Sequence, residues 1–256
     1  LIYNYATNFA NEMKALGVQG VFGPGVNLHR SPFGGRNWEY FSEDTYLTTV
    51  LGCTIVRGLQ NYGCSVEMKH FALNECESGR YACATWLSEQ ALRETYLRPF
   101  QRAVQEENMT GIMSAFNRIG ARWVGGSFGL MTGVLRKEWG FRGMVITDYN
   151  THPEYMNPDQ MVRAGGSLNL IQDMQPASSG ATYNVTHRSA LRNATHDILY
   201  TVANSCAMNG YGDGIKYAYA PSYWKMAIYS LNAITLISMI IWGFFSIKKS
   251  LNFDEK

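Results

Sequence analysis

Three side chains that could take part in chemistry directly follow stretches with the pattern of short strands. Asp148 follows 144–147, an apolar run with β-branched residues, and Lys69 and His70 follow 65–68. In folds that alternate strands and helices, catalytic groups lie at the carboxyl ends of parallel strands. A carboxylate among cations suits nucleophilic attack on an electron-poor carbon. From position alone, a capping aspartate and a strand-end ion pair remain equally good interpretations.

A long irregular segment, residues 26–44, adds further polar groups among aromatic residues, including Arg36 and Glu39. Structureless loops of this length are usually functional in compact domains. Charge-assisted hydrogen bonds from Arg36 and Lys69 would suit the hydroxyl groups of a neutral, polyhydroxylated ligand. With Asp148 as the carboxylate, the set fits attack on a sugar carbon through an oxocarbenium-like transition state. A surface loop held by its own salt bridges is the alternative.

The elements that must position these groups alternate along the chain, as judged from apolar periodicity and turn residues. The expected strands are 20–22, 65–68, 111–116, 144–147 and 168–171. The expected helices are 4–16, 42–60, 88–107 with a kink or break at Pro99, 130–139, 158–164 and 185–208. This alternation predicts an α/β fold with a parallel sheet, open or closed. Polar groups at several strand ends favour a partial (β/α)8 TIM-type barrel, in which Asn117 and Arg118 would join Lys69, His70 and Asp148.

The composition excludes several classes of function. The 256 residues are 46% hydrophobic, enough for one large core, and the net charge of +2 gives no argument for a nucleic-acid partner. The chain lacks the glycine-rich dinucleotide motif, the nucleophile elbow and the zinc-binding His-Glu-x-x-His motif, so neither a cofactor nor a metal site is expected. Five cysteines occur without a Cys-x-x-Cys pair, and pairing of Cys76 with Cys83 stays open.

The carboxyl-terminal part reads as a membrane anchor. Residues 226–247 carry no charge, which matches the length of a spanning helix, and a buried core helix is the alternative. The expected segments are an incomplete barrel domain at 1–209, a linker at 210–224, a transmembrane helix at 225–247 and a short tail at 248–256. Lys248 and Lys249 favour a cytoplasmic carboxyl terminus. We therefore expect a single-pass protein of the cell membrane, with the lipid bilayer as a partner and the large domain outside.

Six longer motifs follow one another between about residue 3 and residue 170. They are Gly-Pro-Gly-Val-Asn-Leu-His-Arg-Ser-Pro (23–32), Gly-Gly-Arg-Asn-Trp-Glu-Tyr-Phe-Ser-Glu-Asp (34–44), Lys-His-Phe-Ala-Leu-Asn-Glu (69–75), Glu-Gln-Ala-Leu-Arg-Glu-Thr-Tyr-Leu-Arg-Pro-Phe (89–100), Leu-Arg-Lys-Glu-Trp-Gly-Phe-Arg-Gly (135–143) and Thr-Asp-Tyr (147–149). In this order they resemble the barrel domain of glycoside hydrolase family 3, which includes β-glucosidases and β-xylosidases.

The resemblance implies hydrolysis of terminal β-glycosidic bonds, in a β-glucoside or β-xyloside, by a retaining double-displacement mechanism. Asp148 matches the family's nucleophile. Arg36, Lys69 and His70 match residues that bind the hydroxyl groups of the glycone, the sugar unit that is released. Glu39 lies in the same binding loop. The family's acid/base is commonly a Glu on a separate α/β-sandwich domain, so we expect that domain upstream in the same polypeptide and little activity from this chain alone.

Two positions depart from the family pattern near the nucleophile. Phe116 stands where members often carry Tyr, and Tyr149 stands where Trp is usual. Both belong to the expected substrate-binding set. The losses leave open a second hypothesis, a catalytically inactive carbohydrate-binding or cell-surface protein that retains the barrel. A third is an unrelated barrel enzyme, such as an aldolase, that uses Lys69 to form a Schiff base.

Overall fold

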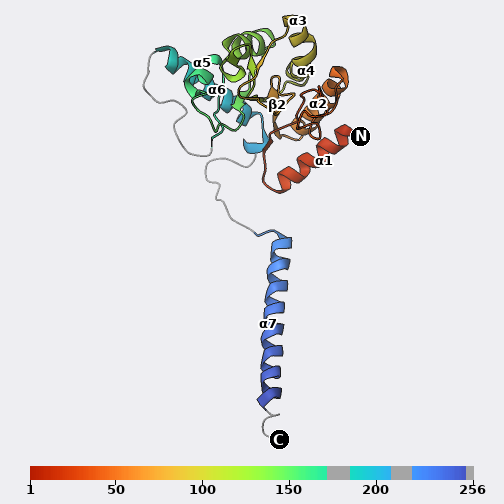
Figure 1. The fold of residues 1–256 in the computed structure, drawn as a ribbon. Helices are drawn as coiled ribbons and strands as arrows, with labels where there is room; N and C mark the ends of the chain where they lie inside the picture. The colour runs from red at the N-terminus through yellow and green to blue at the C-terminus, as the bar shows by residue number, and fades with distance from the viewer. Residues whose placement is uncertain (172–184, 209–220, 252–256) are drawn as a thin grey trace. The chain divides into compact units, whose positions relative to one another are not determined.

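The computed structural model describes residues 1–171, 185–208 and 221–251. Cα packing divides the chain into two compact units, Leu1–Asn209 and Gly210–Lys256 (Figure 1). Most of the expected linker, 210–220, and the end of the expected tail, 252–256, lie outside the described residues.

The first unit is a TIM-like α/β fold around a parallel sheet. In the described part of the chain this sheet has the strand order β1-β2-β4-β7. The strands are β1 (Gly20–Val21), β2 (Ser65–Phe71), β4 (Gly111–Ser114) and β7 (Met144–Thr147). Each strand pairs in parallel with the next one in the sheet, and at least one helix separates successive strands in the chain, which is how such barrels are built. The carboxyl ends of the strands therefore face the same edge of the sheet, as the sequence predicts.

Helices pack against one another and against the sheet (Figure 1). They are α1 (Ile2–Ala15), α2 (Thr45–Gln60), α4 (Arg98–Glu107), η3 (Gly129–Glu138), α5 (Pro158–Ala164) and α6 (Val185–Ala203). Asp44 caps α2 by accepting a 2.6 Å hydrogen bond from the main-chain N of Leu47. α1 packs on α2 at Gly58, where a Cβ atom would lie 2.5 Å from that of Ala6.

The expected helix 88–107 is interrupted earlier than Pro99. It consists of α3 (Glu89–Ala91), a π-helical turn η1 (Leu92–Tyr96) and α4, with Pro99 in the first turn of α4. A proline ring clashes with the carbonyl group four residues before it, and its missing N–H is tolerated only in a first turn. The break therefore precedes the proline, and the following helix begins at Arg98.

The expected strand 168–171 is wrong as a regular strand, because it forms only an isolated parallel bridge between Ile146 and Leu168. Side chains replace part of the ladder. The main-chain N of Leu170 donates to Thr147 Oγ1 at 2.9 Å, and that of Val145 donates to Ser167 Oγ at 3.2 Å. Hydroxyl groups that bond to the main chain compete in this way with strand pairing.

A small second sheet was not expected from the sequence. It has the order β3-β5-β6, with β3 (Ala84–Thr85), β5 (Arg118–Ile119) and β6 (Arg122–Trp123). β5 and β6 form a hairpin that turns at Gly120, whose φ is +56°. Strands of two residues are too short to show an alternating pattern, so composition could not reveal them.

In the second unit the described residues 221–251 form α7 (Tyr223–Leu251). Its stretch Tyr223–Lys248 is, among the described residues, the helix that is long and apolar enough to cross a membrane, with mean hydropathy 1.8 and none of its most apolar window buried. Length and composition are the grounds for this assignment.

Helix α6 ends at Ala203, and Cys206–Met208 form a separate 3-10 turn, so the expected helix 185–208 is too long.

One buried carboxyl group predicts how stability depends on pH. Glu67 on β2 is 2% exposed, and its Oε1 accepts a hydrogen bond from Ser65 Oγ at 3.0 Å. Burial raises its pKa from 4.5 to about 7. The folded protein thus favours the neutral acid. The stability that neutral Glu67 contributes is therefore fully present below pH 4.5 and is lost as the pH rises through 7. By pH 8 the loss should reach roughly 3 kcal/mol.

The change Glu67→Gln should therefore raise the melting temperature at pH 8 much more than at pH 5. Differential scanning calorimetry at the two values would measure the difference. Glu12→Gln, at an exposed site on α1, is the matched control and should show no such pH dependence. Equal shifts at both pH values for Glu67→Gln would contradict the assignment.

Candidate active site

Asp148 lies where β7 ends, with one carboxylate oxygen held and the other left open. Its main-chain N donates to Ser114 O of β4 at 3.0 Å, and Oδ1 accepts from the main-chain N of Tyr149 at 2.8 Å. Oδ2 is buried and, among the described residues, has no hydrogen-bond partner. Buried polar atoms are normally satisfied. An unsatisfied carboxylate oxygen at a strand end is therefore the first sign of a binding site for a ligand.

The charge state of Asp148 reflects opposing effects. Burial raises the pKa of its carboxyl group above the usual value, and the hydrogen bond from the main chain of Tyr149 acts against this. Three cations also lower the pKa without cancelling the effect of burial: Arg80, Arg36 and Lys69. The sequence predicts a carboxylate stabilised by cations. The structure adds that desolvation outweighs them, which leaves a poorly solvated carboxyl group.

Lys69, Glu39 and Arg36 form a connected cluster beside Asp148. Lys69 Nζ lies 2.9 Å from Glu39 Oε1, and Arg36 Nε donates to Glu39 Oε2 at 2.7 Å. Burial acts to raise the pKa of Glu39, but the hydrogen bonds and charges of Lys69 and Arg36 bring it below its usual value. Glu39 is therefore ionised at neutral pH and fixes both cations.

His70 connects this cluster to Asp148. Its Nε2 lies 3.0 Å from Arg36 Nη1 and 3.6 Å from Asp148 Oδ2. Burial, and then the neighbouring cations, lower the pKa of His70 well below its usual value, so the ring is neutral. Because a guanidinium group only donates, Nε2 accepts and Nδ1 carries the proton. Nδ1 is 3.2 Å from Asn27 Oδ1, which can accept a hydrogen bond from Nδ1–H.

Main-chain contacts hold the 26–44 segment against β2. The main-chain N of Val26 donates to Lys69 O at 2.7 Å, and that of Lys69 donates to Pro24 O at 3.0 Å. The register between β2 and β4 shifts between Met68 and Phe71. Such irregularities redirect side chains next to active sites. Arg36 and Lys69, 33 residues apart in the sequence, therefore meet at one carboxylate, Glu39.

Glu77 and Arg80, in the loop between β2 and β3, were not assigned a role from the sequence. Glu77 Oε1 is 3.6 Å from Arg36 Nη1, and its Oε2 is 2.6 Å from Arg80 Nη1. Arg80 lies 4.1 Å from the ring centroid of Phe116 and is one of the cations that lower the pKa of Asp148. Their charges were visible in the sequence, but nothing there placed this loop next to Asp148.

The remaining expected site residues differ in their placement. Phe116 is 3% exposed and lies beneath Arg80, so it supports that side chain from below. Tyr149 is 39% exposed next to Asp148. Arg118 turns away, because its Nε donates to Tyr81 O at 3.1 Å. The expected convergence of Arg118 on Asp148 is therefore wrong, since β5 leads into the hairpin.

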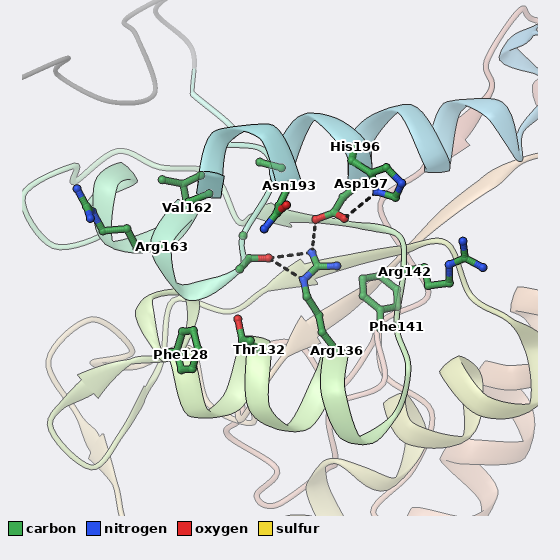
Figure 2. Close-up of a pocket in the computed structure, with 14 residues that line it drawn as sticks. Phe128, Thr132, Arg136, Phe141, Arg142, Val162, Arg163, Asn193, His196 and Asp197 are labelled. Carbon is green, nitrogen blue, oxygen red and sulfur yellow. Dashed lines mark hydrogen bonds and ion pairs between the residues drawn. The ribbon is translucent and has the colours of Figure 1, made fainter. Parts of the chain in front are cut away.

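A separate pocket of about 360 Å³ lies between η3, α5 and α6 (Figure 2). At its floor Arg136 forms an ion pair with Asp197, with 2.8 Å between Nη2 and Oδ2. The same guanidinium donates to Gly165 O at 2.8 and 3.0 Å and to Gly143 O at 3.1 Å. Its donors are engaged by the protein, and none of the expected site residues lines this pocket. We therefore assign it a structural role.

The five cysteines, all within the described residues, are free. The pairing of Cys76 with Cys83 that the sequence left open is therefore not formed, and both thiols are exposed. Among the described residues no group of three or more His, Cys, Asp or Glu side chains could hold a metal ion.

Comparison with known proteins places this chain in a family. Residues 1–165 match the family described as Glycosyl hydrolase family 3 N terminal domain. A beta-glucosidase from Ruminococcus albus is 38% identical over 178 residues, which are 67% of this chain and 19% of that protein. An exo-alpha-(1->6)-L-arabinopyranosidase from Bifidobacterium breve is 40% identical over 177 residues, which are 69% of this chain and 22% of that protein.

Solved structures show the same fold. A beta-glucosidase from Paenibacillus barengoltzii is similar with a TM-score of 0.73 and 31% identity, over 85% of this chain and 25% of that chain. Beta-glucosidase 3B from Thermotoga neapolitana, in complex with glucose, gives 0.71 and 30%, over 82% of this chain and 30% of that chain. The chain spans about a fifth of the length of the two curated relatives. It belongs to glycosyl hydrolase family 3, and residues 1–165 correspond to the N-terminal domain of that family.

Proposed function

We propose that this chain is the nucleophile-bearing part of an enzyme that hydrolyses terminal β-glycosidic bonds, with β-glucosides as the preferred class. The observation that carries the proposal is the open, buried Oδ2 of Asp148 beside the cluster of Arg36, Lys69 and His70. Family membership and the beta-glucosidases among the relatives support it. β-Xylosides and α-L-arabinopyranosides are the competing substrates to include in any assay.

In the proposed mechanism Asp148 Oδ2 attacks the anomeric carbon while the glycosidic C–O bond breaks, and the leaving oxygen takes a proton from the acid/base. The product is a covalent glycosyl ester on Asp148 and a free alcohol. Arg36 and Lys69 donate to the hydroxyl groups of the glycone, and the neutral His70 is held in one orientation by Asn27. Water then hydrolyses the ester, so the configuration of the sugar is retained. Because burial leaves the carboxylate poorly solvated, little water has to be removed from Oδ2 before attack.

The acid/base has to come from outside the described site. A retaining mechanism needs a second carboxyl group roughly 5 Å from the first. The cations Lys69 and Arg36 lower the pKa of Glu39, which makes it an unsuitable proton donor, and Glu77 is paired with Arg36 and Arg80. We assign the acid/base to another domain of the same polypeptide, an α/β-sandwich that precedes this barrel. This chain alone should therefore turn over slowly.

The direct test is to trap the covalent ester. The full-length protein would be incubated with a 2-deoxy-2-fluoro-β-glucoside that carries a good leaving group, then digested and analysed by mass spectrometry. We expect the label on the peptide that contains Asp148. If the folded protein takes up no label with any of several sugar configurations, the non-catalytic carbohydrate-binding hypothesis replaces the enzyme. Borohydride trapping of a carbonyl substrate on Lys69 would instead support the Schiff-base alternative.

Replacing Arg36 should weaken substrate binding. In Arg36→Ala a charge-assisted hydrogen bond to the glycone is lost, and Glu39 and Glu77 lose a shared cation. We expect KM for an aryl β-glucoside to rise about 10- to 100-fold, which corresponds to roughly 1.5–3 kcal/mol. Steady-state kinetics of the full-length protein would measure this. Arg36→Lys keeps the charge without the planar guanidinium, so its KM should fall between those of the wild type and Arg36→Ala. An unchanged KM in Arg36→Ala would refute the role of Arg36 in substrate binding.

We further propose that α7 anchors the protein in the cell membrane with the barrel on the outer side. The uncharged run within Tyr223–Lys248 and the lysines that follow it support this orientation. Protease treatment of intact cells should remove the barrel and leave a membrane-bound fragment. Recovery of the intact protein in the soluble fraction would exclude the anchor.

A further inference from the structure

A pocket of about 550 Å³ lies apart from the residues around Asp148 and has no role in the proposed mechanism so far. The β5–β6 hairpin forms one side of it, and the segment 154–160, which leads from the loop after β7 into the first turn of α5, forms another. Trp86, next to β3, lies at its edge. Its lining combines aromatic rings with charged and amide side chains, including Arg118, Arg122, Glu154, Tyr155 and Gln160.

Trp86 gives this pocket a flat, accessible ring. The side chain is 79% exposed although it is a large aromatic residue. The turn at Gly120 supports the ring, since a Cβ atom there would lie 3.2 Å from Cη2 and 3.3 Å from Cζ3. A side chain at this position would crowd the ring, and its φ of +56° also favours glycine. A ring supported on one side and open to solvent elsewhere is suited to stacking against the apolar face of a pyranose.

The polar groups around the ring fit a neutral ligand rich in hydroxyl groups. The guanidinium of Arg118 lies 4.7 Å from the centroid of the Tyr155 ring, its Nε donates to Tyr81 O at 3.1 Å, and its side chain lines the pocket. Arg122 and Glu154 are exposed and of opposite charge. A strongly acidic ligand would meet Glu154, and a strongly basic one would meet the two arginines.

A layer of aromatic rings connects this pocket to the site at Asp148. Tyr155 donates its hydroxyl group to Phe116 O at 2.6 Å, and Tyr81 packs between the two, with ring centroids 4.8 Å from Phe116 and 5.8 Å from Tyr155. Arg80 covers the other side of Phe116. The pocket is thus one aromatic layer away from the groups that act on the glycone.

The pocket and the proposed glycone site are also built by different elements. The residues proposed to bind the glycone come from β2 and from the 26–44 segment. Apart from Trp86, the pocket is lined by the β5–β6 hairpin, which follows β4, and by residues that follow β7. We propose that it is a subsite for the leaving-group side of an oligosaccharide, and that Trp86 stacks on the second or a later sugar unit of a β-linked gluco-oligosaccharide. This inference rests on the proposed function, because it extends the substrate from a simple β-glucoside to a longer chain.

The first test compares substrates of increasing length in the full-length protein. For each variant, kcat/KM for cellobiose, cellotriose and cellotetraose is divided by kcat/KM for a nitrophenyl β-glucoside. In Trp86→Ala this ratio should fall about five- to tenfold for the two longer substrates, and less for cellobiose. Trp86→Phe, which keeps a ring, should restore part of it. Tyr46→Ala removes an aromatic side chain of similar exposure, 73%, from α2 and is the matched control with an unchanged ratio.

The second test separates the subsite from the catalytic proposal. Cellotetraose binding is measured by isothermal titration calorimetry on Asp148→Asn and on Asp148→Asn combined with Trp86→Ala. A five- to tenfold weaker Kd in the double variant supports the subsite even if the wild-type protein hydrolyses nothing. Activity on the nitrophenyl glucoside with ratios and Kd values unaffected by Trp86→Ala overturns the subsite and leaves the proposed function intact.

Discussion

Asp148→Asn should lower kcat of the full-length protein for an aryl β-glucoside by about 10⁴- to 10⁶-fold, as expected when a nucleophile is removed. The amide has nearly the same shape and can still accept the hydrogen bond from Tyr149 N, so folding should be preserved. What it loses is the open anionic oxygen, Oδ2. Stopped assays with a nitrophenyl or fluorogenic glucoside cover this range of rates.

A second Asp→Asn change provides the control for Asp148→Asn. Asp159, in the first turn of α5, is outside the proposed site, and Asp159→Asn should change kcat by less than about twofold. Near-normal turnover in Asp148→Asn would remove the nucleophile from the proposal. Equal losses in both variants would indicate a folding defect, which circular dichroism of the two proteins would reveal.

Arg136→Ala should strongly lower the stability of the first unit without touching the proposed active site. The Arg136–Asp197 pair (Figure 2) is largely buried, with side chains 16% and 13% exposed. The guanidinium also donates to the main-chain carbonyl groups of Gly143 and Gly165. Removing one partner of a buried pair leaves an uncompensated charge and costs about 3–5 kcal/mol. The melting transition of the barrel should fall by roughly 10 °C in calorimetry.

A neighbour in the same pocket serves as the matched control. Arg142 is exposed and lies 4.9 Å from the ring centroid of Tyr200, so Arg142→Ala should cost no more than about 1 kcal/mol. Arg136→Lys keeps the charge but not the planar guanidinium, so its melting temperature should lie between those of the wild type and Arg136→Ala. If Arg136→Ala and Arg142→Ala have the same melting temperature, the Arg136–Asp197 ion pair does not hold η3 to α6.

Elements specified by their own residues could be predicted from the sequence. The strand Met144–Thr147 is bounded by Gly143 and by Asp148, and the helix Pro158–Ala164 has a capping Asn157 and a proline in its first turn. Both were found with their correct bounds. The family resemblance is confirmed as well. It could be seen in the sequence because each of its motifs is an unbroken stretch of residues.

Features that depend on contacts between distant segments could not be predicted. The direction of Arg118 depends on the hairpin turn at Gly120, and strand-end position alone suggested the opposite. Arg80 reaches the site only because its loop folds over Phe116. The raised pKa of Asp148 depends on burial, which a list of nearby charges does not reveal. Sequence patterns thus identified the reacting groups more readily than their surroundings.

The two exposed thiols make the loop that carries Glu77 and Arg80 accessible to spectroscopy. Cys76 and Cys83 flank both of these side chains and are open to solvent, whereas Cys53 is buried and its pKa is raised to about 12 by that burial. Maleimide reagents act on thiolates, so they should modify the loop long before the interior. A spin label or fluorophore attached there would report, from the native sequence, how the loop orders when a saccharide enters.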